Sequence, residues 1–99
     1  MKELSFEWDP RKADSNIVKH GIGFMEAVTV FRDPLAIIIA DPDSSPNEER
    51  FLILGLNSAA KMLVVCYCLR ENETVIRIIS ARKATTNEER HYSRRKNAA

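Results

Sequence analysis

Two stretches of the sequence combine residue types that can move protons with residue types that can bind phosphate. Lys19 and His20 stand directly before Gly21, a residue typical of the C-terminal end of a helix. The helix dipole favours a charged imidazole at that end, so His20 and Lys19 are candidates for proton transfer or phosphate binding. Alternatively, His20 only binds the last backbone carbonyl groups of the helix. Farther along, Glu49 precedes a predicted strand and is a candidate general base, or a solvated residue of the loop edge.

Arg77 lies in the middle of an otherwise apolar run, residues 74–81. A charged side chain in such a run is costly unless it is paired or faces a ligand. Arg77 is therefore more informative than the arginines of the polar C-terminal segment. The alternative to a ligand is an ion pair with a neighbour such as Glu7 or Glu73.

Three further cations, Arg70, Arg82 and Lys83, lie near Arg77 in the sequence. Arg70 stands where the preceding predicted strand ends and can join Arg77 across the hairpin. Like charges at that distance are unfavourable unless an anion lies between them. In a regular strand Arg77 and Arg82 face opposite sides, unless the strand ends or bulges between them. We expect a phosphate site at the edge of the sheet where these four cations converge.

These candidates belong to a chain of 99 residues with a formal net charge of +1. The length predicts a single domain. Residues 1–69 contain seven Lys/Arg and ten Asp/Glu, a net charge of −3, whereas residues 70–99 contain eight and four, a net charge of +4. The near-neutral total is an average of two unlike parts, so it does not exclude RNA as a partner.

Several classes of protein are disfavoured by what the sequence lacks. No run of about 18 apolar residues occurs and no secretory signal is visible, so we expect a cytoplasmic protein with no membrane partner. No glycine-rich phosphate loop, HExxH, GxSxG or CxxC motif occurs, which disfavours most nucleotide, zinc and hydrolase-triad functions. Cys66 and Cys68 are expected to be buried free thiols, and no metal or other cofactor is expected.

The N-terminal third predicts one strand and two helices. Residues 4–8 alternate as in a strand with Leu4, Phe6 and Trp8 facing inward. Asp9-Pro10 starts a helix that ends at His20, and its thin apolar face consists of Ala13, Ile17 and Val18. A second helix follows Gly23 and ends at Asp33-Pro34. Its apolar stripe has helical spacing and comprises Phe24, Ala27, Val28 and Phe31.

The rest of the chain predicts four strands and a final helix. The strands are residues 35–40, 50–56, 62–69 and 74–81, and their short connections predict an antiparallel meander. The middle strands are apolar on both faces, so the early helices can cover one face, and the last helix, a second copy or another protein must cover the other. The helix of residues 85–97 begins with the capping box of Thr85 and Glu88, and Tyr92 is its only large apolar side chain.

Taken together, these segments resemble the BrnT family of type II toxins, which are ribonucleases with a RelE-like fold. The residues that carry the resemblance, in order, are Phe6-Glu7-Trp8-Asp9 with Lys12 and Asn16, Lys19-His20-Gly21, Phe24-x-Glu26-Ala27 with Asp33-Pro34, Glu49-Arg50-Phe51 with Gly55, Ile76-Arg77-Ile78-Ile79-Ser80-Ala81-Arg82-Lys83-Ala84-Thr85, and Glu88-x-Arg90. The resemblance covers nearly the whole chain and implies a single α+β toxin domain over residues 1–99.

The resemblance also implies a metal-independent ribonuclease that slows translation and is neutralised by a DNA-binding antitoxin of the BrnA type. Contact with DNA would be indirect, through the antitoxin, in a homodimer or a hetero-tetramer. Arg77, Arg82 and Lys83 would hold the phosphate, with His20 or Lys19 moving a proton and Glu49 as a weaker candidate base. Arg70 would also bind RNA, and Tyr92 would either stack on a base or lie in the core.

Two other functions compete with the ribonuclease. One is a non-catalytic, toxin-like interaction module or co-repressor that acts with a DNA-binding partner. The other is a DNA-binding regulator that uses its basic last helix, but that helix lacks the packed inner face that a recognition helix needs. Arginines buried in ion pairs, with no open surface, would favour the interaction module over the enzyme.

Overall fold

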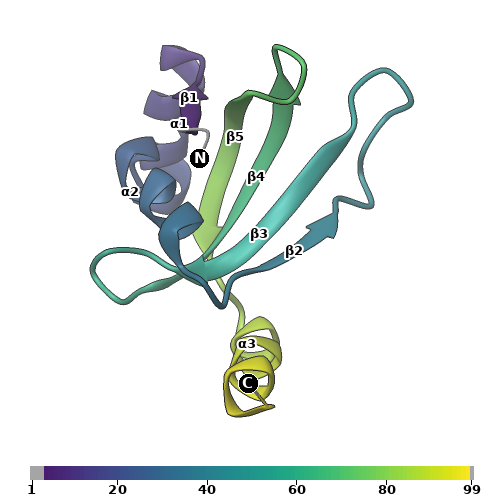
Figure 1. The fold of residues 1–99 in the computed structure, drawn as a ribbon. Coiled ribbons are helices and arrows are strands. Elements are labelled where there is room, and N and C mark those ends of the chain that lie inside the picture. The colour runs from purple at the N-terminus through teal and green to yellow at the C-terminus, as the bar shows by residue number, and fades with distance from the viewer. Residues whose placement is uncertain (1–3, 99) are drawn as a thin grey trace.

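The computed structural model describes residues 4–98, which form a mixed sheet and helices on its two faces (Figure 1). Nine elements follow one another along these described residues. They are β1 (Ser5–Glu7), α1 (Pro10–His20), α2 (Phe24–Val28), the 3₁₀ helix η1 (Thr29–Arg32), β2 (Ile37–Ala40), β3 (Arg50–Leu56), β4 (Met62–Arg70), β5 (Val75–Lys83) and α3 (Thr86–Ala98). No helix among these is long and apolar enough to cross a membrane.

The sheet has five strands in the order β1-β5-β4-β3-β2. Strands β2 to β5 form the antiparallel meander that the sequence predicted. No partner was predicted for the N-terminal strand, and in the structure β1 pairs in parallel with β5, with Glu7 opposite Arg77. The fold is therefore α+β with a mixed sheet, and β1 and β2 are its two edges.

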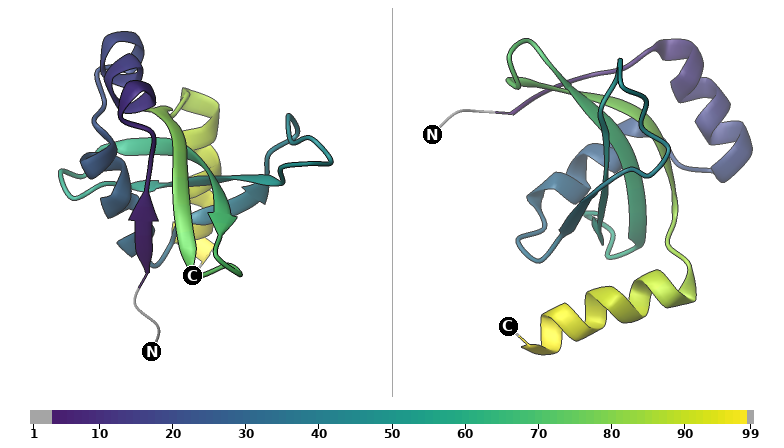
Figure 2. Two further views of the ribbon diagram at one scale, coloured as in Figure 1. Left: turned by 90° about the horizontal axis from the view of Figure 1, so that it is seen from above. Right: turned by 90° about the vertical axis from the view of Figure 1, so that its right-hand side faces the viewer.

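The main core lies between the sheet and the N-terminal helices (Figure 1). It joins α2 and η1 to inward-facing residues of β3, β4 and β5, among them Phe24, Val30, Leu63 and Ile78. Helix α3 lies on the opposite side of the sheet and crosses only one end of it (Figure 2). One face of the sheet is thus closely covered by its own chain, while the other is covered in part.

A bulge in β5 decides which way its arginines point. The pairing of β4 with β5 shifts between Cys66 and Tyr67, where Cys66 opposes Ser80 and Tyr67 opposes Ile78, so Ile79 has no partner. An extra residue in one strand reverses the alternation of side chains beyond it. Arg77 and Arg82 consequently share the face that the N-terminal helices leave open. A regular strand would have placed them on opposite faces.

Helix α1 has the ends that the sequence predicted. The Asp9 carboxylate accepts a hydrogen bond from the Arg11 N–H at 2.9 Å, Pro10 is the first helical residue, and Gly21 adopts a left-handed conformation with φ 69°. The prediction of its inner face was wrong for two residues, because Ile17 and Val18 are 53% and 87% exposed. Leu4, predicted to face inward, is also exposed. The buried residue of α1 is instead polar, as described below.

Helix α3 is held by its cap and by one tyrosine. Thr85 and Glu88 form the predicted capping box: the Thr85 N–H donates to the Glu88 carboxylate at 2.8 Å, and the Glu88 N–H donates to the Thr85 hydroxyl at 3.2 Å. Tyr92 is buried, and its hydroxyl donates to Asp33 at 2.7 Å. Burial, together with this bond and the charge of Asp33, raises the pKa of Tyr92 to about 12. Tyr92 therefore anchors α3 and is not available to stack on a base.

Candidate functional site

The candidate residues fall into two groups that β5 separates. Lys19 and His20 lie on α1, beside the outer edge of β5. Arg70 and Arg77 lie at one end of the open face of the sheet, in neighbouring strands. The structure therefore does not bring the candidate proton donors and the candidate arginines into one pocket.

Asn16 fixes α1 against β5. Its side-chain amide donates to the carbonyl oxygens of Ile22 and Ala81, both at 2.9 Å, and its side-chain oxygen accepts from the Ala81 N–H at 3.0 Å. Because β1 ends at Glu7, opposite Arg77, the edge of β5 beyond that point has no partner strand. The Asn16 amide takes the place of that strand, which satisfies the Ala81 backbone and holds α1 beside the bulge.

Between α1 and the bulge lies a hollow of about 260 Å³, here called the helix pocket. Its lining residues are Lys12, Ser15, Asn16, Lys19, His20, Ile79 and Ser80. The lining residues thus include two lysines, a histidine and two serines, but no aspartate or glutamate. Within residues 4–98, every ion pair uses an arginine, so neither these lysines nor His20 is neutralised by a carboxylate.

On the open face, three arginines form a cluster with three carboxylates, here called the arginine cluster. Its pairs, in order across the sheet, are Arg77 with Glu7 at 2.5 Å, Arg70 with Glu48 at 2.9 Å, and Arg50 with Asp41 at 3.3 Å. Arg77 was predicted either to face a ligand or to pair with Glu7 or Glu73, and the structure shows the pair with Glu7. The side chains of Arg70 and Arg77 are nonetheless 42% and 33% exposed, so solvent reaches their pairs, whereas Arg50 Nε is buried against Asp41.

Two cysteines lie beneath the arginine cluster. Cys66 and Cys68 are buried and free, as predicted. Burial, with the hydrogen bond and charge of Asp41, raises the pKa of Cys66 to about 11. Burial also raises the pKa of Cys68. Because only the thiolate is reactive, both side chains act as apolar packing under the cluster.

Arg82 and Lys83 do not join Arg70 and Arg77, contrary to the expected convergence. Arg82 pairs with Val64 of β4, four residues from Cys68, which is the partner of Arg77. Its guanidinium binds both oxygens of Glu88 at 2.8 and 2.9 Å, and this bond lowers the pKa of Glu88 to about 2. Lys83 is exposed at the end of β5. These two cations therefore lie toward α3.

Glu48 takes the place that was expected for Glu49. Glu49 is exposed and makes no ion pair in the described part of the chain, whereas Glu48 binds Arg70. Both carboxylates line a hollow of about 200 Å³ next to Cys68 and Arg70. If a carboxylate at this end of the sheet accepts a proton, Glu48 is better placed than Glu49 because it already lies beside a cation.

No functional role was predicted for Lys12, Ser80 or Asn16. Lys12, Asn16 and Lys19 are spaced four and three residues apart, which puts them on one side of a helix. That spacing was a usable signal for the helix pocket. The part played by Ser80 depends on the bulge, which no local pattern predicts. Among residues 4–98, no group of three or more His, Cys, Asp or Glu side chains is arranged to hold a metal ion.

Comparison with known proteins adds two findings. A family model described as the ribonuclease toxin BrnT of a type II toxin–antitoxin system matches residues 8–88. The crystal structure of the Brucella abortus ribonuclease toxin BrnT is similar, with a TM-score of 0.65 and 20% sequence identity over 85% of this chain and all of that one. At this identity the likeness supports the fold. No match was found among curated protein sequences.

Proposed function

This chain belongs to the BrnT family of ribonuclease toxins of type II toxin–antitoxin systems, and from that membership we propose that it cleaves RNA without a metal ion, in the helix pocket. Membership confirms the resemblance seen in the sequence. The observation that carries the proposed site is the helix pocket itself, where His20 and two lysines lie together with no carboxylate. An RNA phosphate can enter such a pocket without displacing an ion pair.

In the proposed reaction the ribose 2′-oxygen attacks the adjacent phosphorus. The 2′-hydroxyl loses its proton, and the bond from phosphorus to the 5′-oxygen breaks, which leaves a 2′,3′-cyclic phosphate and a 5′-hydroxyl. His20 accepts the proton of the 2′-hydroxyl, Lys19 donates a proton to the departing 5′-oxygen, and Lys12 stabilises the negative charge that develops on the phosphate oxygens. Ser80, which also lines the helix pocket, would donate a hydrogen bond to the same phosphate. All of these groups belong to the chain, so the reaction needs no bound metal.

The arginines extend the surface that binds RNA. Arg70 and Arg77 at one end of the open face, and Arg82 and Lys83 toward α3, would contact phosphates that flank the cleaved bond. Exposed ion pairs are weak, so a phosphate can replace a carboxylate as the partner of Arg70 or Arg77. Glu48 and Glu49 lie at that end of the sheet and not in the helix pocket, so neither takes the proton in the reaction proposed here; if cleavage instead took place beside Arg70, Glu48 would be the better placed of the two.

We also infer the partners from the family. A DNA-binding antitoxin of the BrnA type would neutralise the toxin and connect it indirectly to operator DNA, in an assembly with two copies of each protein. Because the substrate is RNA used in translation, the site of action is the cytoplasm.

A non-catalytic module or co-repressor is the second candidate. The observation that favours it is that Arg50, Arg70, Arg77 and Arg82 are all paired with carboxylates. These pairs are partly exposed, and the helix pocket contains none, so the ribonuclease explains more of the structure.

The test is cleavage of a defined RNA oligonucleotide by purified protein in the presence of EDTA. His20→Ala is expected to slow cleavage by about 100-fold or more, the usual loss when a general acid or base is removed. His91→Ala is the matched control, because His91 is the other histidine and lies on α3. Wild-type protein that cleaves no RNA would favour the module. Full activity in His20→Ala would move the site away from the helix pocket, to be sought with Arg77→Ala and Arg82→Ala.

A further inference from the structure

Strand β2 is an edge of the sheet with none of the usual protection. Among residues 4–98 it pairs only with β3, and its sequence is Ile37-Ile38-Ile39-Ala40. Ile38 and Ile39 point to opposite faces and are 56% and 53% exposed. Edge strands of monomeric proteins are usually kept from pairing by charged side chains, proline or a bulge. This strand contains none of these, which marks it as a surface for pairing.

The outer side of β2 also presents backbone groups for a further strand. The Asp41 N–H donates to the Arg50 carbonyl at 2.9 Å, and the two residues are directly opposite in the register. In an antiparallel ladder, hydrogen-bonded and non-hydrogen-bonded pairs alternate along the strand. The backbone N–H and C=O groups of Ile37 and Ile39 are therefore also directed toward β3. The N–H and C=O groups of Ile38 and Ala40 are therefore directed away from the sheet, as an incoming strand requires.

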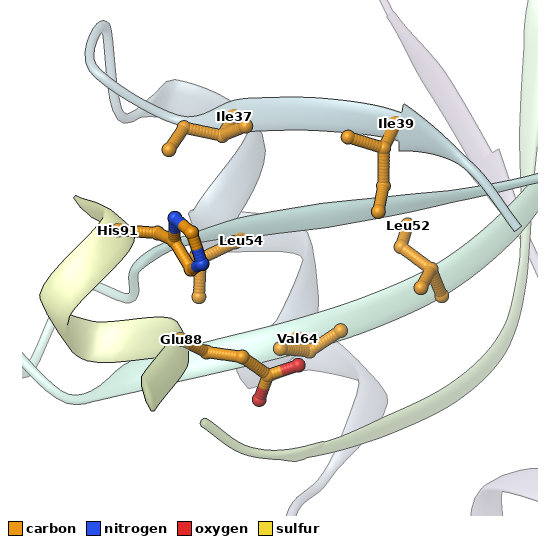
Figure 3. Close-up of a pocket in the computed structure, with 7 residues that line it drawn as sticks. All are labelled: Ile37, Ile39, Leu52, Leu54, Val64, Glu88 and His91. Atoms are coloured by element: carbon orange, nitrogen blue, oxygen red, sulfur yellow. The ribbon is translucent and has the colours of Figure 1, made fainter. Parts of the chain in front are cut away.

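The apolar surface continues from this edge onto the open face. Ile37 and Ile39 of β2 lie beside Leu52 and Leu54 of β3 and Val64 of β4, and they line a groove of about 300 Å³ (Figure 3). One wall of the groove is α3, from which Glu88 and His91 point inward (Figure 3). The edge is thus the border of a broader apolar surface, which favours a protein partner over water.

The charges at the two ends of β2 indicate which partner fits. Before the strand, Arg95 of α3 donates to the Leu35 carbonyl at 3.0 Å, and Lys96 follows it. After the strand, the chain turns at Asp43, which is exposed. One end of the edge is basic, and the other presents the carboxylate of Asp43, although Arg50 lies close by and donates to the Asp43 carbonyl at 3.0 Å. An antiparallel copy of the same strand would set each basic end beside the acidic end of its partner.

We propose that β2 pairs with β2 of a second copy of this chain, antiparallel and about a two-fold axis, to form one continuous sheet. Such an interface is isologous, which means that the same surface of each copy takes part. Arg95 of each copy then lies beside Asp43 of the other, and the apolar edge of both copies is buried. A strand of four residues is short for a stable interface, which needs about 800 Å² from each partner. The basic end of α3 and the loop after β2 therefore supply part of the contact.

Sedimentation equilibrium of the purified full chain, over a range of concentrations, tests the proposal. The expected result is a mass that rises toward twice 11.3 kDa. Ile38→Lys is expected to shift the equilibrium to monomer, because it places like charges at the two-fold axis. Met25→Lys is the matched control, since Met25 is 71% exposed on α2 and lies away from β2. A wild-type chain that stays monomeric throughout would overturn the proposal.

Charge reversal provides a test that does not alter the strand. Arg95→Glu is expected to weaken the dimer about tenfold or less, as for a charge at the rim of an interface. Asp43→Arg in the same chain is expected to restore it, because the pair then exists with its signs exchanged. If the double variant dimerises no better than the single one, this register is wrong. If the variants all dimerise as the wild type does, the copies meet elsewhere.

Discussion

The helix pocket and the arginine cluster contain similar residue types but make different use of charge. In the arginine cluster every cation lies within 3.3 Å of a carboxylate oxygen. In the helix pocket two lysines and His20 share a hollow that no carboxylate lines. The cluster is therefore close to neutral, and a phosphate must compete for its arginines, whereas the pocket offers positive charge that is not already used.

This difference teaches that the number of cations is a poor guide to an anion site. The last third of the sequence has a net charge of +4, and it supplied most of the candidate phosphate ligands. Folding brings two of those arginines, Arg70 and Arg77, to the carboxylates of Glu48 and Glu7 in the acidic part. The two lysines of α1, in the acidic part, keep their charge available. Whether a charge is paired depends on the tertiary structure, which a local count does not include.

Removing the anchor of the helix pocket should have the largest effect on stability. Asn16→Leu keeps the size of the side chain but leaves the Ala81 N–H and the carbonyls of Ile22 and Ala81 without their partner. We expect the free energy of unfolding to fall by about 3 kcal/mol, because buried polar groups left unpaired are costly. Urea denaturation measures it.

The neighbouring substitution Ser15→Ala is the control for Asn16→Leu. Ser15 is exposed on the same helix, so its loss should change the free energy of unfolding by less than about 0.5 kcal/mol. At temperatures where the variant is still folded, Asn16→Leu should lower RNA cleavage while binding through Arg70 and Arg77 persists. A stability equal to that of the wild type would show that other contacts position α1.

Much of the fold could be predicted from the sequence, because its signals are local. Asp9-Pro10 and Gly21 mark the ends of α1, the box of Thr85 and Glu88 starts α3, and β3 has the bounds that its apolar run predicted. The pairing of β1 with β5 could not be predicted in the same way, since a strand of three residues can join either edge of a sheet. The antiparallel meander of β2 to β5 was predicted correctly, so local patterns are sufficient for strands that follow one another through short connections.

The candidate site could be predicted only in part, for reasons that are equally physical. Lys19 and His20 were found because they stand at a helix end. Arg77 was recognised as unusual, and the pair with Glu7 was one of its two interpretations. The bulge at Ile79, the separation of Arg82 from Arg77 and the polar anchor Asn16 all depend on how β5 meets its neighbours. These features depend on tertiary contacts, which a local pattern does not contain. Helix α1 is an example, because its apolar residues Ile17 and Val18 were predicted to face inward but are exposed.

The pair of Arg82 with Glu88 offers a measurable example of a neutralised arginine. Its bonds with Arg82 lower the pKa of Glu88 to about 2, below the ordinary value of 4.5. A carboxyl group whose pKa is lowered by folding adds stability above pH 4.5, and that stability disappears as the pH falls toward 2. Because both side chains are partly exposed, we expect a contribution of about 1 kcal/mol at neutral pH.

Glu88→Gln isolates this contribution, since glutamine keeps the oxygen that caps α3. The difference in the free energy of unfolding between wild type and Glu88→Gln should be about 1 kcal/mol at pH 7 and should shrink between pH 4.5 and 2. Glu89→Gln is the control, because Glu89 is exposed and makes no ion pair in the described chain. A difference that does not depend on pH would mean that the pair adds nothing to stability.

The smallest expected effect is a gain in RNA affinity, and it best distinguishes the arginine cluster from the helix pocket. If Glu7 competes with RNA for Arg77, then Glu7→Gln frees the arginine and should raise the affinity for a non-cleavable, 2′-O-methyl RNA about threefold at low salt. Glu89→Gln changes the net charge by the same amount away from the arginine cluster, and should raise the affinity less. Fluorescence anisotropy at several salt concentrations compares the two. Equal gains would assign the effect to overall charge, and a loss in Glu7→Gln would mean that the carboxylate positions Arg77 for RNA. The expected result is a gain in RNA affinity that is specific to Glu7→Gln, together with cleavage that still depends on His20. That result would show that Glu7 neutralises Arg77 while the helix pocket remains the place of cleavage.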